Sequence, residues 1–225
     1  TLSGGPFNLP GTDEGTTSAG TPIRTVLAGL TYSDPDSSSI GGAAITATTG
    51  NGIWQYSTDG STWTNFGAVS NSSALLLNAS TQVRYSPDGA NGETASLTLR
   101  GWDQTTGFTS VNGTPGLADA SSNGGSTGFS VGTAQAILAV DSVNDAPVMA
   151  GVTPTLGGLT DTSTSNSGAQ VSDLLCGVTD VDTGALKGMA ITDLTAAYGK
   201  WQYSTNAGST WSDVGSVSIT SALIL

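Results

Sequence analysis

The feature that most constrains this chain is a segment that occurs twice. The sequence WQYSTDGSTW begins at Trp54 and returns, one residue longer, as WQYSTNAGSTW at Trp201. An apolar run follows each copy, Ala74–Leu77 after the first and Ala222–Leu225 after the second. An internal repeat on this scale predicts successive modules that share one fold.

The repeat divides the 225 residues into two expected domains, 1–146 and 147–225. Pro147 forces an extended path where a strand-like segment ends, so the boundary is placed there. The second copy stops at Leu225, the counterpart of Leu77, and we expect it to be a partial module cut from a longer array. If Leu225 is instead a natural end, another copy of the chain would complete the open sheet edge by strand exchange and build a fibre.

Composition excludes several functions. Seventeen acidic residues against five basic ones give a net charge of −12, which repels phosphate, so nucleic acid is not an expected partner. The sequence has no histidine and one cysteine, which rules out a Ser/His/Asp triad and a Cys/His zinc site, and we expect no enzyme activity. No apolar run is long enough to cross a bilayer, so membrane insertion is not expected. Cys176 follows two leucines and is expected to be a core residue.

Strand signals dominate the chain. β-Branched and aromatic residues or period-two alternation mark four expected strands: Ile53–Ser57, Gln82–Tyr85, Ser96–Trp102 and Ala134–Val143. Asp59-Gly60 between alternating segments predicts a hairpin. The sequence predicts no helix, because no convincing stretch has apolar residues at spacings of three and four. Many short strands separated by turn residues predict an all-β fold, a β-sandwich.

Tryptophan and tyrosine alternate with glutamine in both copies of WQY, which places the two rings on one face of a strand. Burial of an aromatic ring contributes several kcal/mol, at ~25 cal/mol per Å², so these rings are expected in the core. The alternative is an exposed row of tryptophans that stacks on sugars. The chain would then be a carbohydrate-binding β-sandwich module with surface glycans as partners.

Three further segments bear a specific likeness. They are Tyr85-Ser86-Pro87 with Asn91-Gly92, then Leu97 to Asp103, then Ala139 to Pro147 with its Val-Asn-Asp-Ala-Pro sequence. Together with Asp-x-Asp near each module start, they resemble the cadherin-like (Ig-like) tandem repeats of large secreted bacterial adhesins. The resemblance covers nearly the whole chain and implies tandem Ig-like or cadherin-like β-sandwich modules, the second incomplete.

The same resemblance implies Ca²⁺ bound between neighbouring repeats. Carried over by position, the ligands come from the first loop, one strand end, the linker and the Asp-x-Asp segments: Asp13, Glu14, Asp34, Asp36, Asp103, Asp141, Asn144, Asp145, Asp180 and Asp182. Calcium takes six to eight oxygen ligands, which such a set can provide. Clustered carboxylates repel by ~1–4 kcal/mol per pair, and a divalent cation reverses that effect.

The two Asp-x-Asp segments have another interpretation, because aspartate is favoured in turns without any metal. With Ca²⁺, the chain is expected to be a stiff extender or cell-adhesion region of an extracellular or cell-surface bacterial protein. Few charged residues, abundant Gly, Ser and Thr and a single Cys suit that location.

Overall fold

The computed structural model describes residues 1–225 except 36–40, 106–114, 152, 164–165 and 197. It is mostly β, and its residues form two compact units, Thr1–Asn144 and Asp145–Leu225. The sequence placed the boundary two residues later, after residue 146. Each unit is described by itself below.

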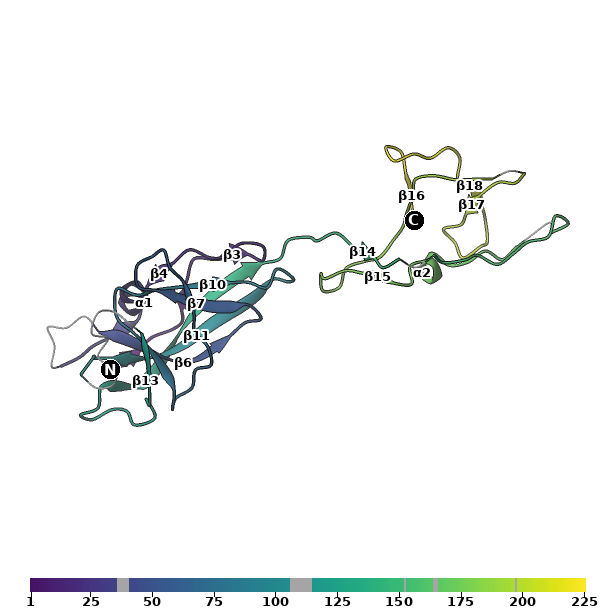
Figure 1. The fold of residues 1–225 in the computed structure, drawn as a ribbon. Coiled ribbons are helices and arrows are strands. Elements are labelled where there is room, and N and C mark those ends of the chain that lie inside the picture. Colours follow the sequence, from purple (N-terminus) through teal and green to yellow (C-terminus); the bar gives the residue numbers. More distant parts are fainter. Residues whose placement is uncertain (36–40, 106–114, 152, 164–165, 197) are drawn as a thin grey trace. The chain divides into compact units, whose positions relative to one another are not determined.

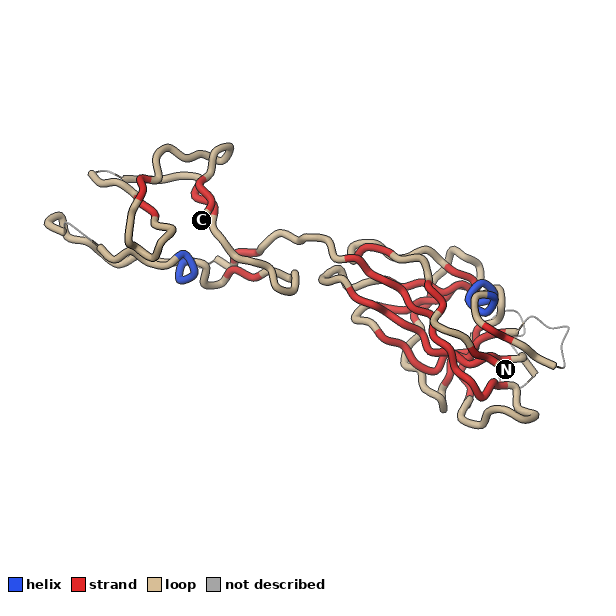
Figure 2. The backbone as a smooth tube through the Cα atoms, turned by 180° about the vertical axis from the view of Figure 1, so that it is seen from behind, coloured by secondary structure: helices blue, strands red, loops and turns tan. Residues whose placement is uncertain are grey.

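Unit 1 contains most of the regular structure (Figures 1 and 2). Its elements in chain order are β1 (Leu2–Ser3), β2 (Phe7–Asn8), β3 (Thr12–Asp13), β4 (Thr21–Pro22), α1 (Ile23–Ala28), β5 (Thr31–Tyr32), β6 (Gly42–Thr49), β7 (Ile53–Ser57), β8 (Thr64–Asn65), β9 (Ala74–Leu77), β10 (Gln82–Ser86), β11 (Glu93–Trp102), β12 (Gly116–Ala118) and β13 (Phe129–Asp141). The four strands expected from the sequence are present as β7, β10, β11 and β13. The expected hairpin is the β7–β8 pair.

Two sheets make up the body of unit 1. One has the order β4-β10-β7-β8, and the other has the order β12-β9-β6-β11-β13-β2, with β3 also paired to β13. Pairing is antiparallel except where β2 and β3 run parallel to β13. The main core cluster takes side chains from both sheets, including Tyr85 and Val83 from β10 and Leu97 and Leu99 from β11.

Strand alternation explains how the larger sheet is buried. Along β13, the buried side chains between Ala134 and Val140 fall at every second residue. In β9, Leu75 and Leu77 join the main core, whereas Leu76 packs with Trp102 in a second cluster. Both faces of β9 are therefore covered, which accounts for its unbroken apolar sequence.

The short helix α1 was not expected from the sequence. Ile23, Val26 and Leu27 lie at i, i+3 and i+4 and are all buried, so a helical stripe is present in the sequence. Pro22 precedes the first helical residue and Gly29 follows the last, as is common at helix ends. The six-residue stripe is too short to stand out among the surrounding strand signals.

Unit 2 carries much less regular structure. Its elements are β14 (Val148–Met149), α2 (Val171–Leu174), β15 (Val178–Thr179), β16 (Ala190–Ile191), β17 (Gln202–Tyr203), β18 (Ser212–Asp213) and β19 (Leu223–Ile224). Its strands form three two-stranded sheets, β14-β15, β16-β19 and β17-β18. Cys176, just after α2, is exposed, so its expected place in the core is wrong.

The pairings of unit 2 repeat those of unit 1 at matching residues. Two pairs of strands show this: Ala44↔Leu76 and Ile45↔Leu75 recur as Ala190↔Ile224 and Ile191↔Leu223, and Gln55↔Asn65 and Tyr56↔Thr64 recur as Gln202↔Asp213 and Tyr203↔Ser212. The isolated bridge between Ser70 and Ser73 likewise recurs between Ser218 and Ser221. The repeated sequence therefore gives repeated local structure, in the same register.

Hydrogen bonds within the hairpin turn repeat as well. Asp59 Oδ1 accepts from the backbone N–H of Thr62 at 2.7 Å, and Asn206 Oδ1 accepts from that of Thr210 at 2.9 Å. The Ser57 hydroxyl also donates to Asp59 Oδ1 at 2.9 Å. In unit 2 the Ser204 hydroxyl donates to Asn206 Oδ1 at the same distance. Accepting these bonds lowers the pKa of Asp59 below its usual range.

Candidate functional site: carboxylates at the linker

The candidate site is the set of acidic residues around the linker 141–145. In unit 1, parallel pairing of β3 with β13 sets Asp13 opposite Asp141. The ladder continues one residue further, where the backbone N–H of Glu14 donates to the Asp141 carbonyl at 3.0 Å. This pairing fixes the Glu14 side chain beside the end of β13.

Glu14 is a buried carboxylate. Only 3% of its surface is exposed. One oxygen, Oε1, accepts a 2.7 Å hydrogen bond from the backbone N–H of Val143. The other, Oε2, is buried and has no hydrogen-bond partner among the described residues. Burial of a charged oxygen without a partner costs free energy, and a bound cation would offset that cost.

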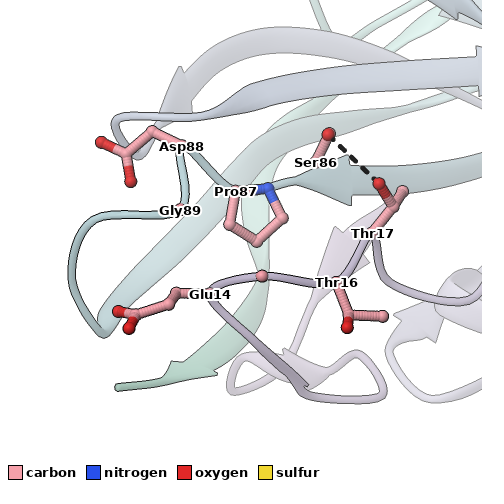
Figure 3. Close-up of a pocket in the computed structure, with 8 residues that line it drawn as sticks. Glu14, Thr16, Thr17, Ser86, Pro87, Asp88 and Gly89 are labelled. Carbon is pink, nitrogen blue, oxygen red and sulfur yellow. Dashed lines mark hydrogen bonds between the residues drawn. The ribbon is translucent and has the colours of Figure 1, made fainter. Parts of the chain in front are cut away.

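A small pocket of about 260 Å³ adjoins Glu14 (Figure 3). It is lined by residues 14–17 of the first loop and by residues 86–89 after β10. Across it, the hydroxyls of Thr17 and Ser86 form a 3.2 Å hydrogen bond. Figure 3 shows the carboxylates of Glu14 and Asp88 extending to the same side of the pocket. Asp88 was not among the ligands expected from the sequence.

In unit 2, the Asp182 side chain is hydrogen-bonded to the first residue of the unit, Asp145. Asp182 Oδ2 accepts a 2.8 Å hydrogen bond from the backbone N–H of Asp145. Its own backbone N–H donates to Asp180 Oδ1 at 3.0 Å. That second bond is an Asx turn, so the turn interpretation holds for Asp180. The two residues of this Asp-x-Asp segment therefore have different roles: one shapes a turn and the other reaches the linker.

Asp103 lies far from the linker within unit 1. Its neighbour Trp102 pairs with Phe129, at one end of β13, whereas Asp141 is at the other end. Thirteen residues of strand span about 40 Å. Grouping Asp103 with Asp141 in one site of this unit is therefore wrong, because the antiparallel register carries the two residues to opposite ends of the sheet.

Asp103 is instead found near Asp34. Burial raises the pKa of Tyr32, and the charges of Asp34 and Asp103 raise it further. The Tyr32 hydroxyl donates a long hydrogen bond of 3.5 Å to the Trp102 carbonyl. Asp103 Oδ1 accepts from the backbone N–H and the hydroxyl of Thr105, at 2.8 and 2.6 Å. Asp36, also an expected ligand, lies outside the described residues.

The remaining expected ligands are Asp13, Asp141 and Asn144, and all three side chains are exposed. The donors on either side of the linker are carboxylate oxygens, with backbone carbonyls between them. Hard oxygen donors of this kind suit Ca²⁺ and offer nothing to a metal that prefers nitrogen or sulfur. The residues present therefore fit the ion that the resemblance implies.

The tryptophans do not form one exposed row. Trp54 and Trp102 are buried, and Arg84 lies over the ring of Trp63 with its guanidinium carbon 4.0 Å from the ring centre. Trp201 and Trp211, in unit 2, are exposed. A sugar platform made of all five is not available in this structure.

No helix among the described residues has the length and apolar character needed to span a membrane. Comparison of the chain with models of protein families, with curated proteins and with solved structures gives no match.

Proposed function

We propose that this chain is a calcium-stiffened repeat region of a large bacterial surface or secreted adhesin, acting as an extender or cell-adhesion module. Its partners are then the neighbouring repeats of the same protein, and its role is mechanical and not catalytic. The likeness of the linker and strand sequences to cadherin-like repeats supports this proposal. The matching registers of the two units support the idea of a repeated module.

The architecture in this proposal is a pair of tandem Ig-like or cadherin-like β-sandwich modules, the second one incomplete. Unit 1 is consistent with this architecture, because its two sheets share one core. Trp54, Tyr85 and Leu99 belong to that core. Unit 2 repeats the pairs β6-β9 and β7-β8 of that arrangement.

The calcium proposal depends on one observation: in each unit, a carboxylate accepts a hydrogen bond from a backbone N–H of the linker. Within unit 1, Glu14 accepts from the backbone N–H of Val143, and within unit 2, Asp182 accepts from that of Asp145. Val143 and Asp145 are separated by one residue, so their Cα atoms lie at most ~7 Å apart along the chain. A cation bound at this linker would offset the repulsion among the acidic residues that flank it.

Bound calcium would stabilise this joint by a modest and measurable amount. Extracellular calcium modules have dissociation constants of ~0.1–1 mM, so ~10 mM Ca²⁺ adds ~1.4–2.7 kcal/mol per site. We expect the melting temperature of the chain, measured by scanning calorimetry, to rise by ~3–11 °C in 10 mM Ca²⁺ relative to a chelator. An equal rise in 10 mM Mg²⁺ would point to general charge screening and would contradict a calcium site.

Variants locate the site. Glu14→Gln and Asp182→Asn each remove one carboxylate and are expected to abolish most of the calcium-dependent rise. Asp161→Asn is the matched control, since Asp161 is exposed and the substitution changes the net charge by the same amount. If the control loses the calcium effect to the same degree, the proposed ligands are wrong.

A further inference from the structure

The open strands of unit 2 are the starting point for a docking surface. Among the described residues, β16 pairs only with β19, and β17 pairs only with β18. In unit 1 the matching strands have a second partner each: β6 also pairs with β11, and β7 also pairs with β10. The second edges of β16 and β17 are therefore unpaired in the part of the chain that the structure describes.

Side-chain burial shows the same difference. Trp54 is 5% exposed and its counterpart Trp201 is 44% exposed. Leu76 is 1% exposed and its counterpart Ile224 is 71% exposed. These residues keep their apolar character in unit 2, although the strands that cover them in unit 1 have no counterpart within the 225 residues.

Trp201 already has the orientation of a covered residue. Its indole N–H donates to the Thr195 carbonyl at 3.1 Å, and the indole N–H of Trp54 donates to the matching Thr49 carbonyl at 3.0 Å. In unit 1 the ring of Tyr85, from β10, lies 4.9 Å from the Trp54 ring, centre to centre. Unit 2 thus presents the ring and lacks the residue that covers it.

We propose that the edges of β16 and β17 and the rings beside them form a docking surface for a strand pair with the sequence pattern of Gln82–Trp102. Unit 1 defines the register. There, β10 sets Tyr85 opposite Trp54 and Arg84 opposite Gln55, so a docked strand places tyrosine opposite Trp201 and arginine opposite Gln202. Likewise β11 sets Leu99 opposite Ile45, so a leucine is placed opposite Ile191.

The occupant must be this strand pair and not an arbitrary apolar ligand. Main-chain pairing supplies affinity in strand addition, and pockets for alternate side chains supply specificity. In unit 1 the donated side chains are Val83 and Tyr85 from one strand and Leu97 and Leu99 from the next, all buried. A second copy of the chain is a poor donor, because its own β10 and β11 are buried in unit 1.

The test adds a synthetic peptide of residues 82–102 to the intact chain and follows backbone hydrogen exchange by mass spectrometry. Exchange within residues 190–192 and 201–204 is expected to slow by about tenfold or more, because the amides on the open strand edges gain partners. Residues 42–57 of unit 1 are the internal control and should not change. A peptide with Tyr85→Asp and Leu99→Asp should have no effect.

A second experiment avoids the free peptide, which can aggregate by itself. Residues 78–102 are appended directly after Leu225, which restores the spacing that joins Leu77 to Gln82 in unit 1 and raises the effective concentration of the strands. Protection of residues 201–204 in this extended chain, and its loss when the two aspartates are introduced, supports the proposal. Unchanged exchange in both arms overturns it. Protection that rises with chain concentration when no peptide is added also overturns it, because the occupant would then be a second copy.

Discussion

Units 1 and 2 share their turns and part of their strand pairing, yet only unit 1 has a large core. In unit 1, β10 and β11 bring Tyr85, Leu97 and Leu99 over Trp54 and Ile45. In unit 2 the same hairpin and the same β16-β19 register form without that cover. Local hydrogen bonds are therefore enough to set the turns and the register, whereas burial depends on strands that come from elsewhere in the sequence.

The largest effect is expected when the equivalent tryptophans of the two units, Trp54 and Trp201, are replaced by alanine. We expect Trp54→Ala to cost about 3–5 kcal/mol of stability, because it removes a buried ring from the core. Trp201→Ala is expected to cost less than about 1 kcal/mol, since Trp201 is exposed. Hydrogen exchange of the slowest amides in each unit gives both values. Equal costs would show that Trp201 is as well packed as Trp54.

A smaller effect is expected from the hydrogen bonds of the buried Tyr85 hydroxyl in unit 1. The Tyr85 hydroxyl donates a short bond to Glu93 and accepts from the backbone N–H of Gly52 at 2.5 Å. Glu93 also accepts from the backbone N–H of Asn51, at 2.9 Å. Burial and the bond to Glu93 raise the pKa of Tyr85.

Tyr85→Phe should therefore destabilise unit 1 by about 1–3 kcal/mol, because Gly52 and Glu93 lose a partner. The measurement is urea denaturation followed by hydrogen exchange in β10 and β11. Tyr198→Phe, at a fully exposed tyrosine of unit 2, is the control and should leave stability unchanged. A loss no larger than the control's would mean that the buried hydroxyl contributes nothing.

The smallest expected effect is a difference in pH dependence between the hairpin turns at Asp59 and Asn206. Accepting hydrogen bonds from Thr62, Ser61 and Ser57 lowers the pKa of Asp59 from its usual 3.8. A group whose pKa is lower when folded stabilises the fold above its unfolded pKa, and that contribution is lost as the pH falls through the folded pKa. Asn206, in the matching position of unit 2, does not titrate.

The turn of unit 1 should therefore loosen as the pH is lowered below 3.8, while that of unit 2 should not. Amide chemical shifts of Thr62 and Thr210, recorded by NMR between pH 5 and the acid limit of the fold (about pH 2), provide the comparison. Asp59→Asn should make the first turn as insensitive as the second. Identical acid responses of the two turns in the unmodified chain would contradict this account of Asp59.

Part of the candidate site could be predicted from the sequence. Glu14, Asp145 and Asp182 were all expected as ligands, because the resemblance to cadherin-like repeats implies ligands at these positions. The position of Asp103 was not predictable, since it depends on the antiparallel register that carries β11 away from the linker. Asp88 was missed because its nearness to Glu14 arises from two loops distant in sequence.

The sequence by itself determined the β-rich character, the strands β7, β10, β11 and β13, the hairpin and the repeat, because alternation and turn residues act over a few neighbouring residues. Only the tertiary structure decided which side chains are buried and which carboxylates meet the linker. Trp54 and Trp201 lie in nearly identical sequences, yet one is covered and the other exposed. The reason is physical: burial is a property of what packs against a residue, and that partner is far away in the chain.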